Sequence, residues 1–250
     1  MNKYMFFLII FTCGLFVRCA NSDMSSGPES GDCLPDVADK YEYPVMPGTT
    51  EWNSASMDEK LALIQLPDEK LESLSSHALI RSLLDMPSLA MNYMLSSNSS
   101  PIGTCNRFVF SQHNSVAEFE KRKDRVDALI SYYETVGFGC YHSLDEKDQM
   151  SFPVQLYVLQ IWFTRDAILH SLDKAQKKRV VSLLLQKYRQ QSDVMGALSV
   201  GEGALTAMAW IMYDDQYAPV VSHYGTVSSN EYFTAGNVDD VIAFAKNYTR

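Results

Sequence analysis

The chain has 250 residues, of which 46% are hydrophobic, and it carries a formal net charge of −9 at pH 7. This length suits one globular domain or two small ones. The acidic balance argues against nucleic acid as a partner, because lysine and arginine form only two short runs, at 121–123 and 177–179. We interpret both runs as solvated helix faces.

The N-terminus is typical of an export signal. Lys3 precedes an apolar run from Met5 to Val17, which is shorter than the ~20 residues that a membrane-spanning helix needs. Cys19 follows shortly after this run, as the lipidated cysteine of a bacterial lipoprotein does, although Arg18 departs from the small residue usual before it. We predict a signal peptide over 1–19, of the lipoprotein type, with an ordinary cleaved signal peptide as the alternative.

The mature chain is predicted to begin with a flexible tether over 20–40, since serine, glycine, proline and acidic residues predominate there. A single helical domain over 41–250 is expected to follow. Its first stretch, 41–52, contains two prolines and is predicted to be an extended lead-in. Tyr43, Val45 and Trp52 are expected to pack it against the helical body.

Short helices follow the lead-in. Ser56 and Glu59 have the spacing of a capping box and predict a helix through Gln65. Further helices are expected over 67–73, from Ser75 or Ser76 to about residue 86, and over 88–95. The polar stretch 96–103 is a candidate boundary between two subdomains.

The middle of the chain is predicted to hold longer helices. We expect a helix over 104–113 and one long helix over about 115–135, capped by Asn114 or Ser115. The apolar run 152–172 predicts a central helix around which the others pack, with Pro153 in its first turn.

The last third continues the helical pattern. Asp173 is placed to cap a helix over 174–191, and a strongly apolar helix is expected over 204–213. Short extended pieces are predicted at 217–221 and 226–228, before a final helix capped by Asn237. The fold class is therefore all-α: an irregular multi-helix array, either a superhelical stack or a compact bundle, with minor extended segments near the C-terminus.

Three cysteines lie beyond the signal segment and Cys19: Cys33, Cys105 and Cys140. In an oxidising compartment they could form one disulfide and leave one free thiol, or form none. Their spacing does not match a zinc site or a CxxC redox motif. No cofactor and no metal site is expected.

The candidate catalytic groups lack a recognisable signature. Cys140 and His142 are alternate residues, a spacing that seldom produces a thiolate–imidazole pair. His170 is interpreted as a core or boundary residue of the central helix. The remaining candidates lie in the C-terminal third: Glu202, Asp214, Asp215 and His223.

The lead-in Tyr43-Pro44-Val45, Pro47-Gly48-Thr49 and Glu51-Trp52, with Leu66-Pro67 and the stretch 71–87, resembles the N-terminal region of uncharacterised exported helical proteins of gut-type bacteria. The resemblance covers roughly residues 41–124. It implies an exported helical module and no particular chemistry. Some relatives continue into a segment with a Cys–His pair, which is missing after Asp214 here.

These observations favour an exported binding or interaction module at the bacterial cell envelope, lipid-anchored through Cys19 or otherwise periplasmic or secreted. Its partner would be a protein, a peptide or a glycan. The alternative is an envelope hydrolase whose site lies in the C-terminal third. An enzyme should bring at least two of its candidate groups together in a cleft, whereas a binding module should expose an apolar surface.

Overall fold

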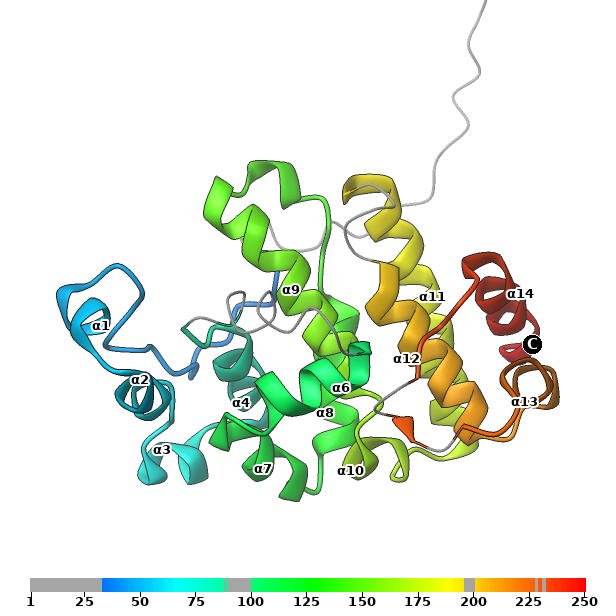
Figure 1. Cartoon of the computed structure of the whole chain (residues 1–250), viewed down its shortest axis with the longest axis horizontal. Helices are drawn as coiled ribbons and strands as arrows, with labels where there is room; N and C mark the ends of the chain where they lie inside the picture. The colour runs from blue at the N-terminus through cyan, green and yellow to red at the C-terminus, as the bar shows by residue number, and fades with distance from the viewer. Residues whose placement is uncertain (1–32, 88, 90–99, 196–200, 228, 231–232) are drawn as a thin grey trace, which may run out of the picture.

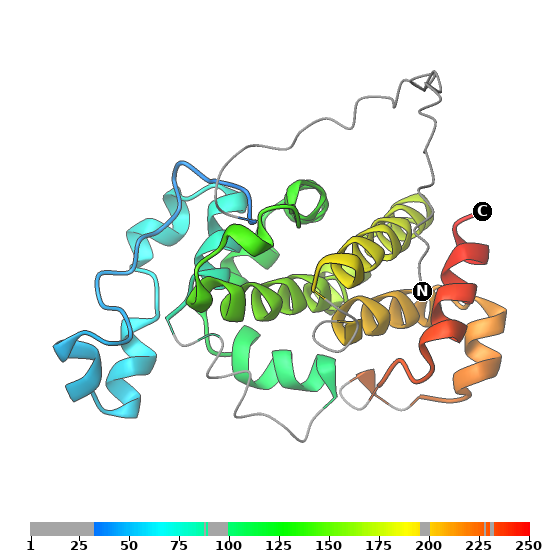
Figure 2. The same cartoon turned by 90° about the horizontal axis from the view of Figure 1, so that it is seen from above.

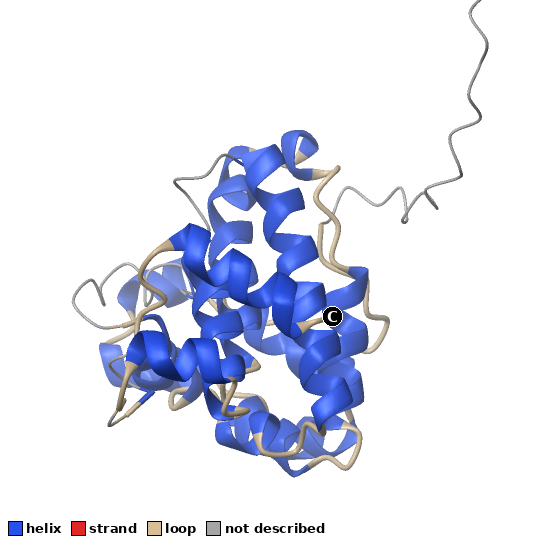
Figure 3. Cartoon of the chain, turned by 90° about the vertical axis from the view of Figure 1, so that its right-hand side faces the viewer, coloured by secondary structure: helices blue, strands red, loops and turns tan. Residues whose placement is uncertain are grey.

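The computed structural model of the chain describes residues 33–87, 89, 100–195, 201–227, 229–230 and 233–250. Within these ranges every regular element is a helix and there is no β-strand, as Figure 3 shows. The all-α prediction is confirmed. The elements are α1 Thr50–Ser54, α2 Met57–Leu63, α3 Asp68–Ser73, α4 Ser76–Leu84, α6 Pro101–Cys105, the π-helical η1 Asn106–Phe110, α7 Asn114–Lys121, α8 Arg125–Thr135, the 3₁₀-helical η2 Tyr141–Ser143, α9 Glu146–Trp162, α10 Asp166–Leu169, α11 Lys174–Met195, α12 Gly201–Asp214, α13 Ala218–Tyr224 and α14 Val238–Tyr248.

The helices follow one another across the molecule in chain order. Figures 1 and 2 both place α1–α3 at one end and α13–α14 at the other. Helix α9 lies between these ends and contacts α4, α6 and α12. The arrangement is an irregular array built around one helix. Among the described helices, none is both long and apolar enough to cross a membrane.

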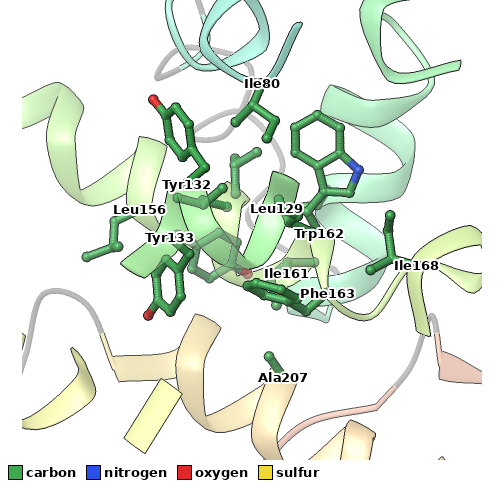
Figure 4. Close-up of a cluster of buried hydrophobic side chains, with 14 of the residues drawn as sticks. Ile80, Leu129, Tyr132, Tyr133, Leu156, Ile161, Trp162, Phe163, Ile168 and Ala207 are labelled. Carbon is green, nitrogen blue, oxygen red and sulfur yellow. The ribbon is translucent and has the colours of Figure 1, made fainter. Parts of the chain in front are cut away.

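The second half of α9 forms the middle of the core. Leu156, Ile161 and Trp162 have no exposed surface. Figure 4 shows these side chains between Ile80 of α4 on one side and Ala207 of α12 on the other. A helix that is apolar on all sides has to be buried on all sides, so the expectation that other helices pack around this segment is confirmed.

Several predicted helix caps are present. The Ser56 hydroxyl accepts a hydrogen bond from the amide of Glu59, whose carboxylate accepts one from the amide of Ser56. Ser75 caps α4 by accepting from the amide of Ala78, and Asn237 caps α14 by accepting from the amides of Asp239 and Asp240. Asp173 caps α11 by accepting from the amide of Gln176 at 2.8 Å. These caps satisfy amides that have no partner within their own helix.

The predicted limits of the central helix are wrong. Helix α9 begins at Glu146, where Asp145 caps it, so Pro153 lies inside the helix and not in its first turn. Proline has no amide hydrogen, and the carbonyl of Gln149 loses its usual partner. The Tyr141 hydroxyl donates to that carbonyl at 3.4 Å, which replaces the missing bond.

The same helix also ends ten residues earlier than predicted, because Arg165 is drawn out of the helical path. Arg165 has extended backbone angles and begins the separate helix α10. Its guanidinium donates twice to Glu120 of α7, at 2.7 and 2.9 Å, and once to Asn106. A two-pronged ion pair of this kind holds the chain in a fixed geometry.

The long helix predicted over 115–135 is two helices, α7 and α8. The chain leaves the helical path at Arg122, whose backbone is extended and whose guanidinium donates to the carbonyl of Leu71 at 2.7 Å. His113, and not Asn114 or Ser115, is the N-cap of α7. The break lets both helices contact α4.

Residues 217–221 were predicted to be extended and are largely helical. Pro219 occupies the first turn of α13, which tolerates proline, and Gly225 ends this helix with a φ of +65°. Thr226 and Val227 are not in a strand, and Ser228 lies outside the described residues.

The tether was predicted to extend to residue 40, but the packed part of the chain begins at Cys33. Cys33, Leu34 and Val37 are buried, and Cys33 forms a disulfide with Cys140 across a sequence separation of 107 residues. Cys105 remains a free, buried thiol. The signal segment, Cys19, the predicted helix over 88–95 except Leu89, and the first half of the polar stretch 96–103 lie outside the described residues.

Candidate functional site

The site that we consider is a groove between the lead-in and the beginning of α9. Its cavity volume is about 1150 Å³. One wall consists of residues from 40 to 64, including α1 and α2, the other of residues 145–155, and the floor of residues 84–89. In Figure 1 the walls are the blue segments at the left and the green upper end of α9. Its lining includes Tyr41, Tyr43, Met46, Trp52, Met57, Lys60, Leu61, Ile64, Leu84, Met86, Leu89, Met150 and Gln155.

The lead-in wall is held in place by buried aromatic and aliphatic side chains. Tyr43, Val45 and Trp52 are all less than a tenth exposed, so the predicted packing of the lead-in is confirmed. Thr49 caps α1 by accepting from the amide of Trp52 at 3.2 Å. The ammonium of Lys60 lies 5.8 Å from the centre of the Trp52 ring, a cation–π contact that links α2 to α1.

The opposite wall is the beginning of α9 with its cap, residues 145–155. Asp145 caps the helix by accepting from the amide of Asp148 at 2.8 Å. Gln155 donates to the carbonyl of Leu84 at 2.9 Å and so ties this wall to the end of α4 at the floor. These bonds place Met150 at the groove, where its side chain is in solvent.

The groove collects most of the exposed large apolar side chains of the described residues. Among described residues, five large apolar side chains are classed as exposed, and Met46, Met57, Leu61 and Met150 line the groove. Met57 is 69% exposed and Met150 is 63% exposed. The fifth, Val238, lies on α14. Exposed apolar side chains that gather at one hollow mark an interaction surface, since scattered ones are ordinary.

The charges on the groove are mostly negative. Five carboxylates and three lysines are part of its lining: Glu42, Asp85, Asp145, Glu146 and Asp148 against Lys40, Lys60 and Lys147. Asp85 forms an ion pair with Arg81 at 2.7 Å. The acids around the beginning of α9 also interact favourably with the positive end of that helix.

Beneath the groove, Tyr43 begins a buried chain of hydrogen bonds. Its hydroxyl donates to the carbonyl of Ser82 at 2.8 Å and lies 2.6 Å from Nε2 of His113. Nδ1 of His113 accepts from the amide of Ser115. Desolvation lowers the pKa of His113 to about 4 and raises the pKa of Tyr43. Ser115 has no exposed surface, so this Ser–His–Tyr chain is a structural link and offers no accessible nucleophile.

The structure uses Cys140 for the disulfide with Cys33, which removes it from any pairing with His142. The ring of His142 is exposed and lies against that of Tyr141, 5.5 Å between centres. His170 is also exposed and not in the core, and its Nε2 lies 3.4 Å from Asp214. The central-helix interpretation of His170 is therefore wrong, because the chain leaves α9 before it.

The four candidate groups of the C-terminal third do not converge on one cleft. Glu202 is in the first turn of α12 and Asp214 in its last turn. The two residues are therefore separated by roughly 18 Å along the helix axis. His223 contacts the rings of Tyr224 and Phe244. Only the neighbours Asp214 and Asp215 lie together, and Lys177 stands 2.8 Å from the first and 3.8 Å from the second.

This acidic pair has a structural explanation. The Tyr248 hydroxyl donates to Asp215 at 2.8 Å, which joins α14 to the end of α12. Burial, followed by the nearby carboxylates, raises the pKa of Tyr248. Lys177, Asp214, Asp215 and Tyr248 thus connect three helices. In the described ranges no group of three or more His, Cys, Asp or Glu side chains is arranged to hold a metal ion.

The methionines of the groove were not identified from the sequence. Met57 begins a short polar helix, and Met150 stands in a polar stretch, so neither belongs to an apolar periodicity. The only sign of these methionines in the sequence is that each is an isolated large apolar residue among polar neighbours. It does not show which surface such a residue will share with others distant in the chain.

Comparison with known proteins yields no matching family model, no matching curated protein and no matching solved structure.

Proposed function

We propose that the chain is an exported helical interaction module that binds a polypeptide segment of another protein in the groove between the lead-in and α9. The observation that carries this proposal is the concentration of exposed apolar side chains there: Met46, Met57, Leu61 and Met150. Binding would remove these side chains from water, which is the main favourable term in most protein association.

The size of the groove supports a polypeptide over a small molecule. Its volume of about 1150 Å³ exceeds the ~300–1000 Å³ of typical small-molecule pockets. Methionine side chains are flexible and polarisable, and they adapt to differently shaped apolar partners. A groove with three exposed or part-exposed methionines therefore suits a segment whose several apolar side chains enter together.

The location of the module at the cell envelope rests on the N-terminal segment. We propose that the chain is exported and anchored by lipid on Cys19, with a soluble exported form as the alternative. The test is incorporation of labelled palmitate by bacteria that produce the chain, with Cys19→Ser as the control. Absence of label from the unaltered chain would contradict the anchor and leave the groove unaffected.

The groove itself can be tested through Trp52, which lines it. An amphipathic peptide of leucine and serine should change Trp52 fluorescence on titration, measured in a Trp210→Phe background so that only buried Trp162 also contributes. Met57→Ser combined with Met150→Ser should weaken binding at least tenfold, because apolar area is lost from the contact.

Val238→Ser is the matched control, since among the described residues it alters the one exposed large apolar side chain that does not line the groove. It should leave peptide binding unchanged. Equal binding by the control and the methionine double variant would show that the groove is not the binding site.

A further inference from the structure

We propose that the polypeptide segment bound in the groove is cationic: it carries lysine or arginine beside the apolar side chains that enter the groove. This inference rests on the function proposed above and names the chemistry of the partner. It follows from which charged groups of the groove are already engaged within the chain and which are not.

Three carboxylates of the groove have no ion-pair partner in the part of the chain that the structure describes. They are Glu42 on the lead-in wall and Glu146 and Asp148 on the α9 wall, and all three are exposed. The other two are engaged, Asp85 with Arg81 and Asp145 as the cap of α9. Negative charge therefore faces solvent on both walls, each of which also carries an exposed methionine.

The lysines of the groove do not balance all of its carboxylates. Five carboxylates line it against the three lysines Lys40, Lys60 and Lys147, and four carboxylates remain when Asp85 is counted with Arg81. Lys60 keeps its positive charge in its contact with the Trp52 ring, at 5.8 Å. The positive end of α9 offsets part of the charge of Glu146 and Asp148. The net charge of −9 on the whole chain adds to the negative potential that the helix end reduces, and it favours the approach of a cationic partner.

An anionic occupant of the same apolar character, such as a fatty acid, would meet this field unfavourably. A like charge set against an exposed carboxylate weakens binding, whereas a lysine or arginine at the rim gains an ion pair without being buried. The combination of adaptable methionines and a negative rim thus selects a segment with an apolar face and a basic face.

The experiment compares three peptides of equal length and identical leucine positions, with lysine, serine or glutamate at the remaining positions. Binding to the full chain is followed by Trp52 fluorescence in the Trp210→Phe background. We expect the lysine peptide to bind at least tenfold more tightly than the glutamate peptide at low salt. This preference should shrink as salt increases, because exposed charge pairs are screened.

The decisive variant combines Glu42→Gln, Glu146→Gln and Asp148→Asn. It should reduce affinity for the lysine peptide about tenfold and leave affinity for the serine peptide unchanged. The control combines Asp166→Asn, Asp193→Asn and Glu202→Gln, which removes the same formal charge from exposed positions that do not line the groove. A similar loss in the control would show that only net charge acts, and it would overturn the assignment to the groove.

The two proposals fail in different ways. If all three peptides bind equally and Met57→Ser with Met150→Ser abolishes binding, the groove is the site but its partner is not cationic. If no peptide binds, or if the methionine variant has no effect on any of them, the proposed function itself is wrong.

Discussion

Cys33 and Cys140 join the two stretches of chain that lead into opposite walls of the groove. Their Cα atoms are 5.5 Å apart although 107 residues separate them in sequence. Cys33 precedes the lead-in, and Cys140 lies shortly before the beginning of α9. The amide of Gly137 also donates to the carbonyl of Cys33 at 3.0 Å, so the link consists of a covalent bond and a hydrogen bond.

The first prediction concerns this disulfide. Replacing both residues, Cys33→Ser with Cys140→Ser, should lower the free energy of unfolding by about 3–5 kcal/mol, since closing a loop of roughly 100 residues restricts the unfolded chain by about that amount. Urea unfolding with and without a reducing agent measures it. The reducing agent should destabilise the unaltered chain and leave the double variant unchanged. An unaltered chain that is insensitive to reduction under unfolding conditions would contradict the link.

The second prediction concerns pH and His113. Its pKa is about 4 in the folded chain and ~6.5 when unfolded, so the unfolded state binds the proton first. The stabilising contribution is present above pH ~6.5 and is lost as the pH falls towards 4. Lowering the pH from 7 to 5 should reduce the free energy of unfolding by about 2 kcal/mol, measured by urea unfolding at both pH values.

The matched controls separate His113 from the other titrating groups. His113→Gln should be less stable at pH 7 and should lose most of this pH dependence. His142→Gln, which alters an exposed histidine, should retain it. The same pH dependence in both variants would assign it to other groups.

The third prediction concerns the contact between α9 and α12 at Gly203. A Cβ atom there would lie 2.7 Å from Oε1 of Gln160 and 3.3 Å from the backbone of Tyr157. Gly203→Ala should therefore lower the free energy of unfolding by about 1–3 kcal/mol, despite the better helix propensity of alanine.

Gly139→Ala is the control for this contact, because a Cβ at Gly139 meets nothing within 4 Å. Its effect should be within about 0.5 kcal/mol. If Gly203→Ala is equally neutral in urea unfolding, the two helices do not approach each other as closely as described.

The fourth prediction concerns Lys177, which stands between Asp214 and Asp215. Lys177→Met should leave two neighbouring carboxylates without their cation and destabilise the fold by about 1–2 kcal/mol, a value reduced by the partial exposure of all three side chains. Combining it with Asp214→Asn should recover part of the loss. Lys174→Met, at an exposed position on the same helix, is the control. A double variant with simply additive losses would show that the pair does not interact.

Local patterns predicted the beginnings of several helices correctly. Ser56 with Glu59, Asp173 and Asn237 begin their helices as expected, because a side chain and a nearby amide are enough to make a cap. The apolar content of 152–162 was enough to predict the buried helix at the middle of the array.

Boundaries set by distant partners were predicted wrongly. Nothing near Arg165 indicates that Glu120 will draw it out of α9, and nothing near Arg122 indicates its bond to the carbonyl of Leu71. The sequence left open which cysteines would pair, and the groove depends on Met57 and Met150 lining the same cavity although almost a hundred residues separate them. Such contacts exist only once the helices are packed.

Pro153 has a consequence for the timescale of motion in the groove wall. The two turns of α9 before it are joined to the rest of the helix by one backbone bond fewer, and the Tyr141 hydroxyl replaces that bond at a long 3.4 Å. The amides of residues around Met150 should therefore exchange with deuterium faster than those around Ile161. One continuous helix thus contains a readily opened segment at the groove and a protected segment in the core.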